Sequence, residues 1–326
     1  MSIVATPSVD PRYSSVIKGT ALVAEGGGQR GIFTAGVLDS WLDVNFNPFE
    51  ILIGTSAGAQ NLSSYVTKQA GFAHKSIMEL SQDKHFFNLK RSFIGGHTVD
   101  LDWFFNQVKQ SKYQLNVKAG INAIQDRDLL FTTTNVTDYK AHFFRPNNDN
   151  WLTLLKASSA LPFLYKKGVN IAGDYHVDGG LSAPLPVEEA YNRGAKKIVV
   201  IRTIPEGSQA MTPWLHRLRS WLRSRKQCVK AVNYYVHHEN VYRRSLRFIE
   251  NPPEDVEIIQ IFPKVNLASK LIGSSDLELE HDYLAGKDVG RQLLSMGQLD
   301  FLAHQMPCTN VVSSTHWQTK SLQQAS

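Results

Sequence analysis

The most constraining feature of this sequence is the pentapeptide GTSAG at residues 54–58, which stands between an apolar run at residues 49–53 and a segment with helical spacing of apolar residues. A G-x-S-x-G pattern between a strand and a helix is typical of a sharp elbow that exposes the hydroxyl of a serine. The glycines are needed because a side chain at Gly54 or Gly58 would collide with the neighbouring strand or helix. Ser56 is therefore a candidate nucleophile.

A glycine loop precedes this elbow. The apolar residues 21–24 predict a short buried strand, and Gly26, Gly27 and Gly28 follow it, ahead of another segment with helical spacing. Glycines at such a position allow unpaired backbone N–H groups to approach an anionic oxygen, and the helix dipole favours negative charge there. The loop is thus predicted to cradle an anion.

The same loop permits a second interpretation as a dinucleotide-binding site, because Gly26, Gly28 and Gly31 satisfy the pattern G-x-G-x-x-G. Such a site needs an acidic residue about 20 positions further on, at the end of the second strand. Glu50 has about the right spacing, but it begins that strand, which ends in Gly-Thr-Ser. We prefer the anion cradle and keep the dinucleotide site as an alternative.

Strands and helices alternate along the chain, which indicates an α/β fold with a mostly parallel sheet and helices on both faces. Beyond the elbow, helices are expected at residues 100–109, 151–157, 187–194 and 277–304, and strands at residues 129–136, 140–144, 197–201 and 256–262. In the first of these helices Leu101, Phe104, Phe105 and Val108 share one face, which we expect to wall a substrate pocket. Ligands of such sheets bind at the carboxyl ends of the strands, where both the glycine loop and the elbow fall.

Three blocks, EGGGQRG, GTSAG and DGG, occur in this order, and the segment ASSALPF precedes the last of them. In this combination the chain resembles the patatin-like phospholipase family over residues 18–205. The resemblance implies an α/β fold, mostly a parallel sheet sandwiched by helices, with a mainly helical C-terminal extension. It implies a serine lipid acyl hydrolase, which is a phospholipase A or a non-specific carboxylic ester hydrolase.

The resemblance also implies roles for individual residues. Ser56 would be the nucleophile, Asp178 the proton acceptor of a two-residue dyad, and the glycine loop the oxyanion hole. The oxyanion residues are Gly26, Gly27, Gly28 and Arg30, the last of which matches the basic residue of the family's loop. The motif glycines are Gly31, Gly54, Gly58, Gly179 and Gly180. Glu25 stands where the family often has Asp, and no metal or cofactor is implied.

Two neighbours of Asp178 offer alternatives to the dyad. Asp174 is a second carboxylate, but the Gly179-Gly180 pair favours Asp178, because glycines permit a close approach of the backbone. His176 would share a strand face with Asp178 and could complete a triad. In α/β-hydrolases, however, several strands precede the elbow, and here one strand precedes the strand that carries it. We therefore prefer Asp178 acting directly as the base, as the resemblance implies.

The chain is expected to divide into four parts. These are an N-terminal arm at residues 1–17, a patatin-like catalytic core at residues 18–205, a region at residues 206–306 with a basic helix, the last strand and C-terminal helices packed on the core, and a flexible tail at residues 307–326. Cys228 and Cys308 predict neither a disulfide framework nor a metal site. With no signal peptide and no run of ~18 apolar residues visible in the sequence, we expect a cytoplasmic location, and a position peripheral to the inner face of the membrane is an open alternative.

Positive charge gathers in one segment, since residues 212–250 hold nine basic and two acidic residues in a chain of net charge +6. A helix near residues 214–224 would be amphipathic, with Trp214 and Trp221 on the apolar face and Arg217 and Arg223 away from it. The helix either packs on the core or lies on anionic lipid. A peripheral contact with an anionic membrane through residues 214–247 is thus an open prediction.

Two other functions remain possible on the sequence. The first is an acyltransferase, which forms the same acyl-enzyme and passes the acyl group to an alcohol. The second is a catalytically silent peripheral membrane-binding protein that acts through the basic segment. The partner expected in every enzymatic interpretation is a phospholipid or another acyl ester, and no nucleic acid is expected.

Overall fold

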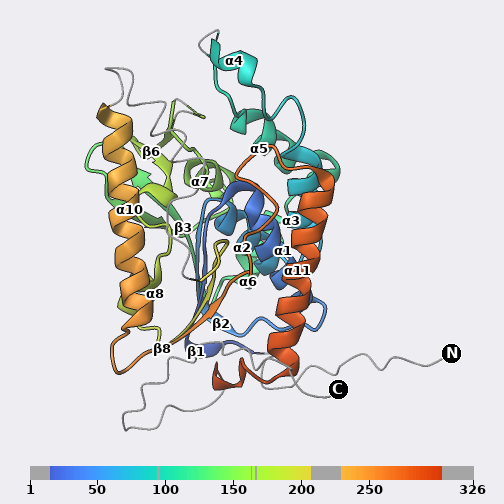
Figure 1. The fold of residues 1–326 in the computed structure, drawn as a ribbon, viewed down its shortest axis with the longest axis vertical. Coiled ribbons are helices and arrows are strands. Elements are labelled where there is room, and N and C mark those ends of the chain that lie inside the picture. Colours follow the sequence, from blue (N-terminus) through green and yellow to red (C-terminus); the bar gives the residue numbers. More distant parts are fainter. Residues whose placement is uncertain (1–14, 94–95, 163, 166, 207–228, 303–326) are drawn as a thin grey trace, which may run out of the picture.

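The computed structural model describes residues 15–93, 96–162, 164–165, 167–206 and 229–302. These residues form an eight-stranded sheet in the order β5-β6-β3-β2-β1-β7-β8, with β4 paired to β3, and helices cover both faces (Figure 1). The strands are β1 (Ile17–Ala24), β2 (Phe49–Thr55), β3 (Asp128–Asn135), β4 (Ala141–Phe144), β5 (Val169–Ile171), β6 (Asp174–Asp178), β7 (Lys197–Ile201) and β8 (Glu257–Ile261).

The helices lie between and after these strands. They are α1 (Gly31–Leu42), α2 (Ala57–Val66), α3 (Phe72–Lys75), α4 (Leu89–Phe93), α5 (Leu101–Lys109), α6 (Val117–Ala123), α7 (Trp151–Ser158), α8 (Val187–Asn192), α10 (Val229–Glu250) and α11 (Asp276–Ser295). Short helical turns are η2 (Gly28–Arg30), η3 (Ser76–Leu80), η4 (Ser111–Tyr113), η5 (Gly179–Leu181) and η7 (Asp300–Leu302). The expected helix at residues 277–304 is therefore shorter at its C-terminal end, because Gly297 adopts a positive φ of 64° after the last helical turn.

The five strands β3, β2, β1, β7 and β8 run parallel, and β4, β5 and β6 pair antiparallel at one end of the sheet. The predicted α/β fold with a mostly parallel sheet is confirmed. Successive residues of β1 face opposite layers. Leu22 packs in a core with Phe33 of α1 and Leu62 of α2, whereas Val23 packs in a second core with Val187 of α8 and Tyr242 of α10. Each fully buried aliphatic side chain contributes about 1.5–3 kcal/mol to folding.

The register of the sheet brings two distant segments together at the carboxyl ends of the parallel strands. Thr55, the last residue of β2, pairs with Thr132 of β3. The next residue of β3, Thr133, pairs on its other side with Asp178, the last residue of β6. Ser56, which follows Thr55, and Asp178, which ends β6, therefore lie close together at this edge of the sheet, although they are far apart in sequence.

The C-terminal helix α11 packs closely along α1 on one side of the molecule, while α10 lies along the opposite side (Figure 1). Glycines make the close approach possible, because a Cβ at Gly286 would lie 2.1 Å from Phe33 O and one at Gly36 would lie 2.1 Å from Tyr283 O. A capping box formed by Ser275 and Glu278 begins α11. Within the described ranges, no helix combines the length and apolarity needed to cross a membrane.

Some predictions fall on residues that the structure does not describe. The basic amphipathic helix near residues 214–224 lies outside the described residues, as do most of the N-terminal arm and the tail at residues 307–326. Of the basic segment, residues 229–250 are described, and they form α10. There Arg243 forms an ion pair with Glu239, and Arg244 forms one with Glu188 of α8.

Candidate active site

Ser56 occupies a strained turn between β2 and α2, with φ 54° and ψ −121°. A non-glycine residue in such a conformation costs on the order of 1–3 kcal/mol, so the surroundings must hold it. The backbone N–H of Ser56 donates to Ser158 Oγ at 2.9 Å. A Cβ at Gly58 would lie 2.2 Å from Ala24 O, and one at Gly54 would lie 2.6 Å from Ala59 Cα. The turn therefore excludes side chains on both sides of the serine, as the sequence predicts.

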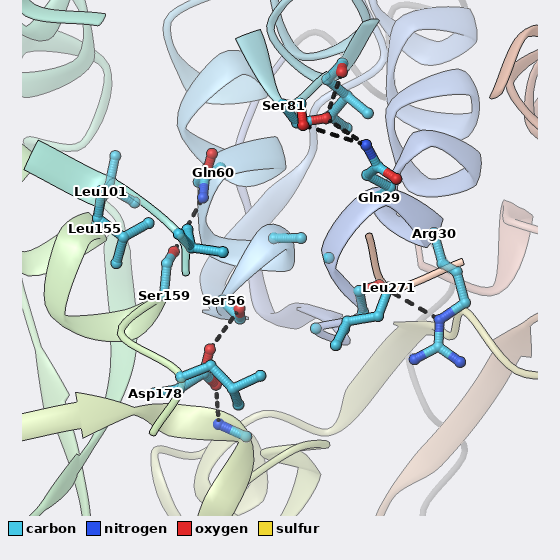
Figure 2. A pocket seen from close by; sticks show the side chains of 18 of the residues that line it. Gln29, Arg30, Ser56, Gln60, Ser81, Leu101, Leu155, Ser159, Asp178 and Leu271 are labelled. Carbon is cyan, nitrogen blue, oxygen red and sulfur yellow. Dashed lines mark hydrogen bonds between the residues drawn. The ribbon is translucent and has the colours of Figure 1, made fainter. Parts of the chain in front are cut away.

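Ser56 and Asp178 meet directly. Ser56 Oγ donates a hydrogen bond of 2.8 Å to Asp178 Oδ2, which Figure 2 shows as a dashed line. The other carboxylate oxygen, Oδ1, accepts the N–H of Gly180 at 2.7 Å, and the N–H of Asp178 donates to Ala160 O at 3.0 Å. Because Ser158 and Ala160 belong to one short segment, that segment fixes the backbones of both residues of the pair.

The carboxyl of Asp178 is buried, and burial raises its pKa to about 6. The hydrogen bonds from Gly180 and Ser56 oppose this increase, because they stabilise the ionised form. A carboxylate with this pKa is mostly ionised at neutral pH and still accepts a proton more readily than an exposed aspartate. The pair can therefore transfer a proton from the serine hydroxyl to the carboxylate.

The glycine loop separates β1 from α1 through the turn η2, so its amides precede the helix by one turn. Most neighbouring N–H groups are used, since those of Glu25, Gln29 and Arg30 donate to Ile201 O, Leu271 O and Gly27 O. In the described part of the chain, no hydrogen bond uses the N–H groups of residues 26–28, and all three glycines line the cavity beside Ser56. Gly28 has φ 58°, a conformation that suits glycine. The loop thus offers three backbone donors beside the serine.

Arg30 and Glu25 stabilise this loop from its two ends. The Arg30 Nε–H donates weakly to Gly27 O at 3.4 Å, and Figure 2 shows the guanidinium beyond Leu271 as seen from Ser56. Glu25 is buried, and its carboxylate accepts the N–H of Thr203 at 2.5 Å. Burial raises the pKa of Glu25, and the nearby Arg202 opposes this increase.

A cavity of about 240 Å³ opens beside Ser56 and Asp178. Its walls are largely apolar and come from α5, α7, the segment after α7 and the segment before α11. They include Leu101, Phe104, Phe105, Val108, Leu155, Leu161, Leu164, Leu271 and Ile272. The expected position of the apolar face of α5 at a pocket wall is confirmed. Two hydrogen-bonded polar pairs, Gln60 with Ser159 and Gln29 with Ser81, also line it (Figure 2).

The other titratable residues near Asp178 have different surroundings. The ring of His176 is buried, its Nδ1 is paired with Thr133 Oγ1 at 2.9 Å, and it packs against His142 and Phe144 of β4. Burial lowers the pKa of His176, with His142 adding to the effect. Asp174 lies at the exposed start of β6. Of the two carboxylates considered, Asp178 is therefore the one that meets Ser56.

Glu50, which a dinucleotide site would require, lies at the opposite end of the sheet from the glycine loop. It accepts hydrogen bonds from Lys18 Nζ and Gly19 N at the beginnings of β1 and β2. The geometry therefore disfavours the dinucleotide interpretation. Among the described residues, no group of three or more His, Cys, Asp and Glu side chains is arranged to hold a metal ion.

Three functional-site contacts were not predicted from the sequence. Ser158 Oγ accepts the N–H of Ser56, and Leu271 O accepts the N–H of Gln29. His238 of α10 is hydrogen-bonded through Nδ1 to Gly180 O. Ser158 belongs to the ASSALPF segment, whose small polar residues could have indicated a role. Leu271 and His238 lie in the C-terminal region, where no catalytic motif marks them.

Comparisons with known proteins show the family of this chain. A family model described as "Patatin-like phospholipase" matches residues 22–191, and a "Domain of unknown function (DUF6363)" matches residues 228–297. An uncharacterized protein of Escherichia coli K12, YjjU, is 40% identical over 291 residues, which are 89% of this chain and 80% of that protein.

Solved structures show a more distant likeness. VipD from Legionella pneumophila is 14% identical with a TM-score of 0.41, and the match covers 88% of this chain and 68% of that one. Human GIVD cytosolic phospholipase A2, in complex with methyl gamma-linolenyl fluorophosphonate, is 12% identical with a TM-score of 0.43. That match covers 90% of this chain and 59% of the human chain, so this protein spans about three fifths of that relative.

Proposed function

Because this chain belongs to the patatin-like phospholipase family and is a lipid hydrolase, we propose that it is a serine acyl hydrolase with Ser56 as nucleophile and Asp178 as base. The observation that carries the proposal is the hydrogen bond of 2.8 Å between Ser56 Oγ and Asp178 Oδ2, at the mouth of an apolar cavity. A serine hydroxyl is a weak nucleophile until a base within hydrogen-bond reach accepts its proton.

In the proposed reaction, Asp178 accepts the proton of Ser56 as Oγ attacks the carbonyl carbon of an ester. The tetrahedral intermediate carries its negative charge on the former carbonyl oxygen, for which Gly26, Gly27 and Gly28 offer backbone N–H groups. Asp178 then returns the proton to the departing alcohol, which leaves an acyl-enzyme. A water molecule, which gives its proton to Asp178, then attacks the acyl-enzyme in the same way. The fatty acid leaves, and Asp178 returns the proton to Ser56 Oγ.

The oxyanion donors are expected to matter nearly as much as the nucleophile. Removing one preorganised donor of this kind typically costs about 2.7–4 kcal/mol of transition-state stabilisation. Arg30 supports the arrangement through its hydrogen bond to Gly27 O, which restrains the peptide that links the donors. We include Arg30 in the oxyanion hole in this supporting sense.

The apolar walls of the cavity support a substrate with a fatty acyl chain. We propose a phospholipid or another lipid ester, cleaved in the manner of a phospholipase A or a non-specific carboxylic ester hydrolase. A cytoplasmic location suits the two widely separated cysteines. Contact with an anionic membrane is proposed for the basic part of residues 214–247, where the arginines of α10 at 243 and 244 are already ion-paired.

The proposal is tested by labelling with a fluorophosphonate, which reacts with activated serines, followed by a panel of phospholipid vesicles, glycerides and short p-nitrophenyl esters. We expect the label on Ser56 in the wild type, no label on that residue in Ser56→Ala, and loss of ester hydrolysis to background in that variant. Ser295→Ala, on the far helix α11, is the matched control and should keep full activity. Turnover that survives Ser56→Ala would refute the assignment of the nucleophile.

A further inference from the structure

Helix α10 contacts the turn that follows Asp178. The inward face of α10 carries His238, Tyr242, Ser245 and Ile249, which recur at helical spacing, and the last three are buried. Tyr242 and Ile249 join the apolar core between α8, α10 and the sheet. With the helix fixed in this way, His238 lies against the turn η5 and lines the cavity.

His238 donates a hydrogen bond to that turn. Its Nδ1 lies 2.5 Å from Gly180 O. Since a carbonyl oxygen only accepts, Nδ1 carries the hydrogen and a neutral ring has its lone pair on Nε2. Burial lowers the pKa of His238, which favours the neutral ring, and the charged or titratable groups around it are Glu239 and His237 of α10 and Arg30 of the glycine loop.

Gly180 is the residue whose N–H donates to the carboxylate of Asp178 at 2.7 Å. Its N–H and its C=O lie on either side of a single glycine Cα, where the backbone has the greatest rotational freedom. Because both groups extend from that Cα, a hydrogen bond that anchors the carbonyl keeps the Cα in place and limits how far the N–H can move from the carboxylate. His238 thus contacts the partner of Asp178 rather than Asp178 itself.

We infer that His238 is a positioning residue, which holds Gly180 so that its N–H stays directed at the carboxylate of Asp178. The inference rests on the proposed function of Ser56 and Asp178. A neutral donor suits this place, because a cationic donor such as lysine would stabilise the carboxylate and make it a weaker base. It also gives a role to part of the region that matches a domain of unknown function.

The test compares three variants in the full chain. His238→Leu removes the donor, whereas His238→Asn keeps an N–H donor at the same distance from Cα as Nδ1. Ile249→Ala weakens the docking of α10 at a point about 16 Å further along the helix, so it controls for a general loosening of this helix. For each protein the experiment measures melting temperature, kcat and KM for a soluble ester over a range of pH, and the rate of fluorophosphonate labelling.

We expect His238→Leu to lower kcat and the labelling rate together by roughly 10- to 100-fold, with KM little changed, because the base is misdirected while the cavity remains. The acid limb of its pH profile should move to higher pH, because Asp178 loses a donor that stabilises its ionised form. His238→Asn should recover most of the activity and the original limb. Ile249→Ala should melt at a lower temperature with kcat unchanged.

Several results would overturn the inference while leaving the proposed function intact. These are wild-type kinetics in His238→Leu, an inactive but folded His238→Asn, or a loss of kcat in Ile249→Ala as large as that in His238→Leu. If His238→Leu does not fold, the Asn variant decides. A wild-type protein that hydrolyses no ester and takes no label at Ser56 would instead refute the proposed function, and the inference with it.

Discussion

The regions at residues 22–191 and 228–297 make different kinds of contribution to the site. The first supplies the proposed reacting groups, Ser56 and Asp178, and the glycine loop, each within a recognisable motif. The second supplies single contacts from residues without a motif, and these contacts restrain the two halves of the site. Each proposed reacting group thus lies in a motif that is visible in the sequence, whereas the contacts that restrain these groups come from distant segments without a motif.

The two halves of the site are held by different parts of the C-terminal region. His238 of α10 is hydrogen-bonded to the turn after Asp178. The glycine loop is instead bonded to the segment before α11: the N–H of Gln29 donates to Leu271 O, and the side-chain Oε1 of Gln29 accepts the N–H of Ser274. Leu271 also lies against Gly28, where a Cβ would come within 2.3 Å of Leu271 O. Because α11 begins directly after the segment of Leu271 and Ser274, the packing of α11 on α1 also restrains the position of that segment against the glycine loop.

The largest effect is expected in the first region. Asp178→Asn removes the base and should lower kcat on the order of 10⁴-fold, because residues that act as one unit lose activity together. His176→Ala, two residues away, should keep kcat within a few-fold, since the His176 ring is paired with Thr133. Steady-state assays on a soluble ester measure both. A folded His176→Ala as inactive as Asp178→Asn would indicate a triad.

A change in the second region tests whether the C-terminal helix is necessary for the fold. In Gly286→Val the new Cβ would lie only 2.1 Å from Phe33 O. We therefore expect the free energy of unfolding to fall by about 3 kcal/mol or more, and activity to fall with it. Leu284→Val, on the half-exposed face of the same helix, is the matched control and should change stability by less than about 0.5 kcal/mol. Denaturant unfolding measures both. Wild-type stability in Gly286→Val would show that the close packing of α11 on α1 is not needed for the fold.

The buried base should reduce the stability of the first region in a pH-dependent way. Asp178 has a pKa of about 6 in the folded protein and an ordinary value of 3.8, so ionisation above pH 6 costs about 3 kcal/mol. The cost is absent below about pH 4 and complete above about pH 6. Asp178→Asn should therefore raise the melting temperature at pH 8 and lose that advantage at pH 4. An equal shift at both values would contradict a raised pKa.

The smallest effect on a soluble substrate is expected from the basic segment. Replacing Arg217, Arg219, Arg223 and Arg225 with Gln should weaken binding to anionic vesicles by roughly 1 kcal/mol for each arginine near the bilayer surface. Turnover of a soluble ester should not change, and added salt should mimic the substitutions. Cosedimentation with vesicles at low ionic strength measures the effect. Equal cosedimentation of the two proteins would leave the segment with a packing role alone.

The sequence sufficed for those parts of the fold and site that depend on local patterns. The alternation of apolar segments predicts the sheet, and the spacing of Leu101 and Phe105 predicts which face of α5 is buried. The elbow around Ser56 requires glycines that are visible in the sequence. These features follow from steric limits that act over a few residues.

Other features depend on register and long-range packing, which a single sequence does not reveal. The spacing of Tyr242 and Ile249 indicates that His238 rather than His237 faces inward, but the turn that His238 meets there depends on where α10 packs. That Leu271 O reaches the N–H of Gln29 depends on how the segment before α11 crosses the loop, and no local pattern encodes this crossing.

The position of β7 in the sheet has a consequence for how the protein can be divided. The matched family segment ends before β7, yet β7 pairs with β1 in the middle of the sheet, and β8 covers the other side of β7. All five residues of β7 are buried. A fragment limited to residues 22–191 would leave β1 as an open edge with unsatisfied N–H and C=O groups and a row of apolar side chains. Such an edge recruits strands from other molecules, so the fragment should aggregate rather than fold as an independent enzyme.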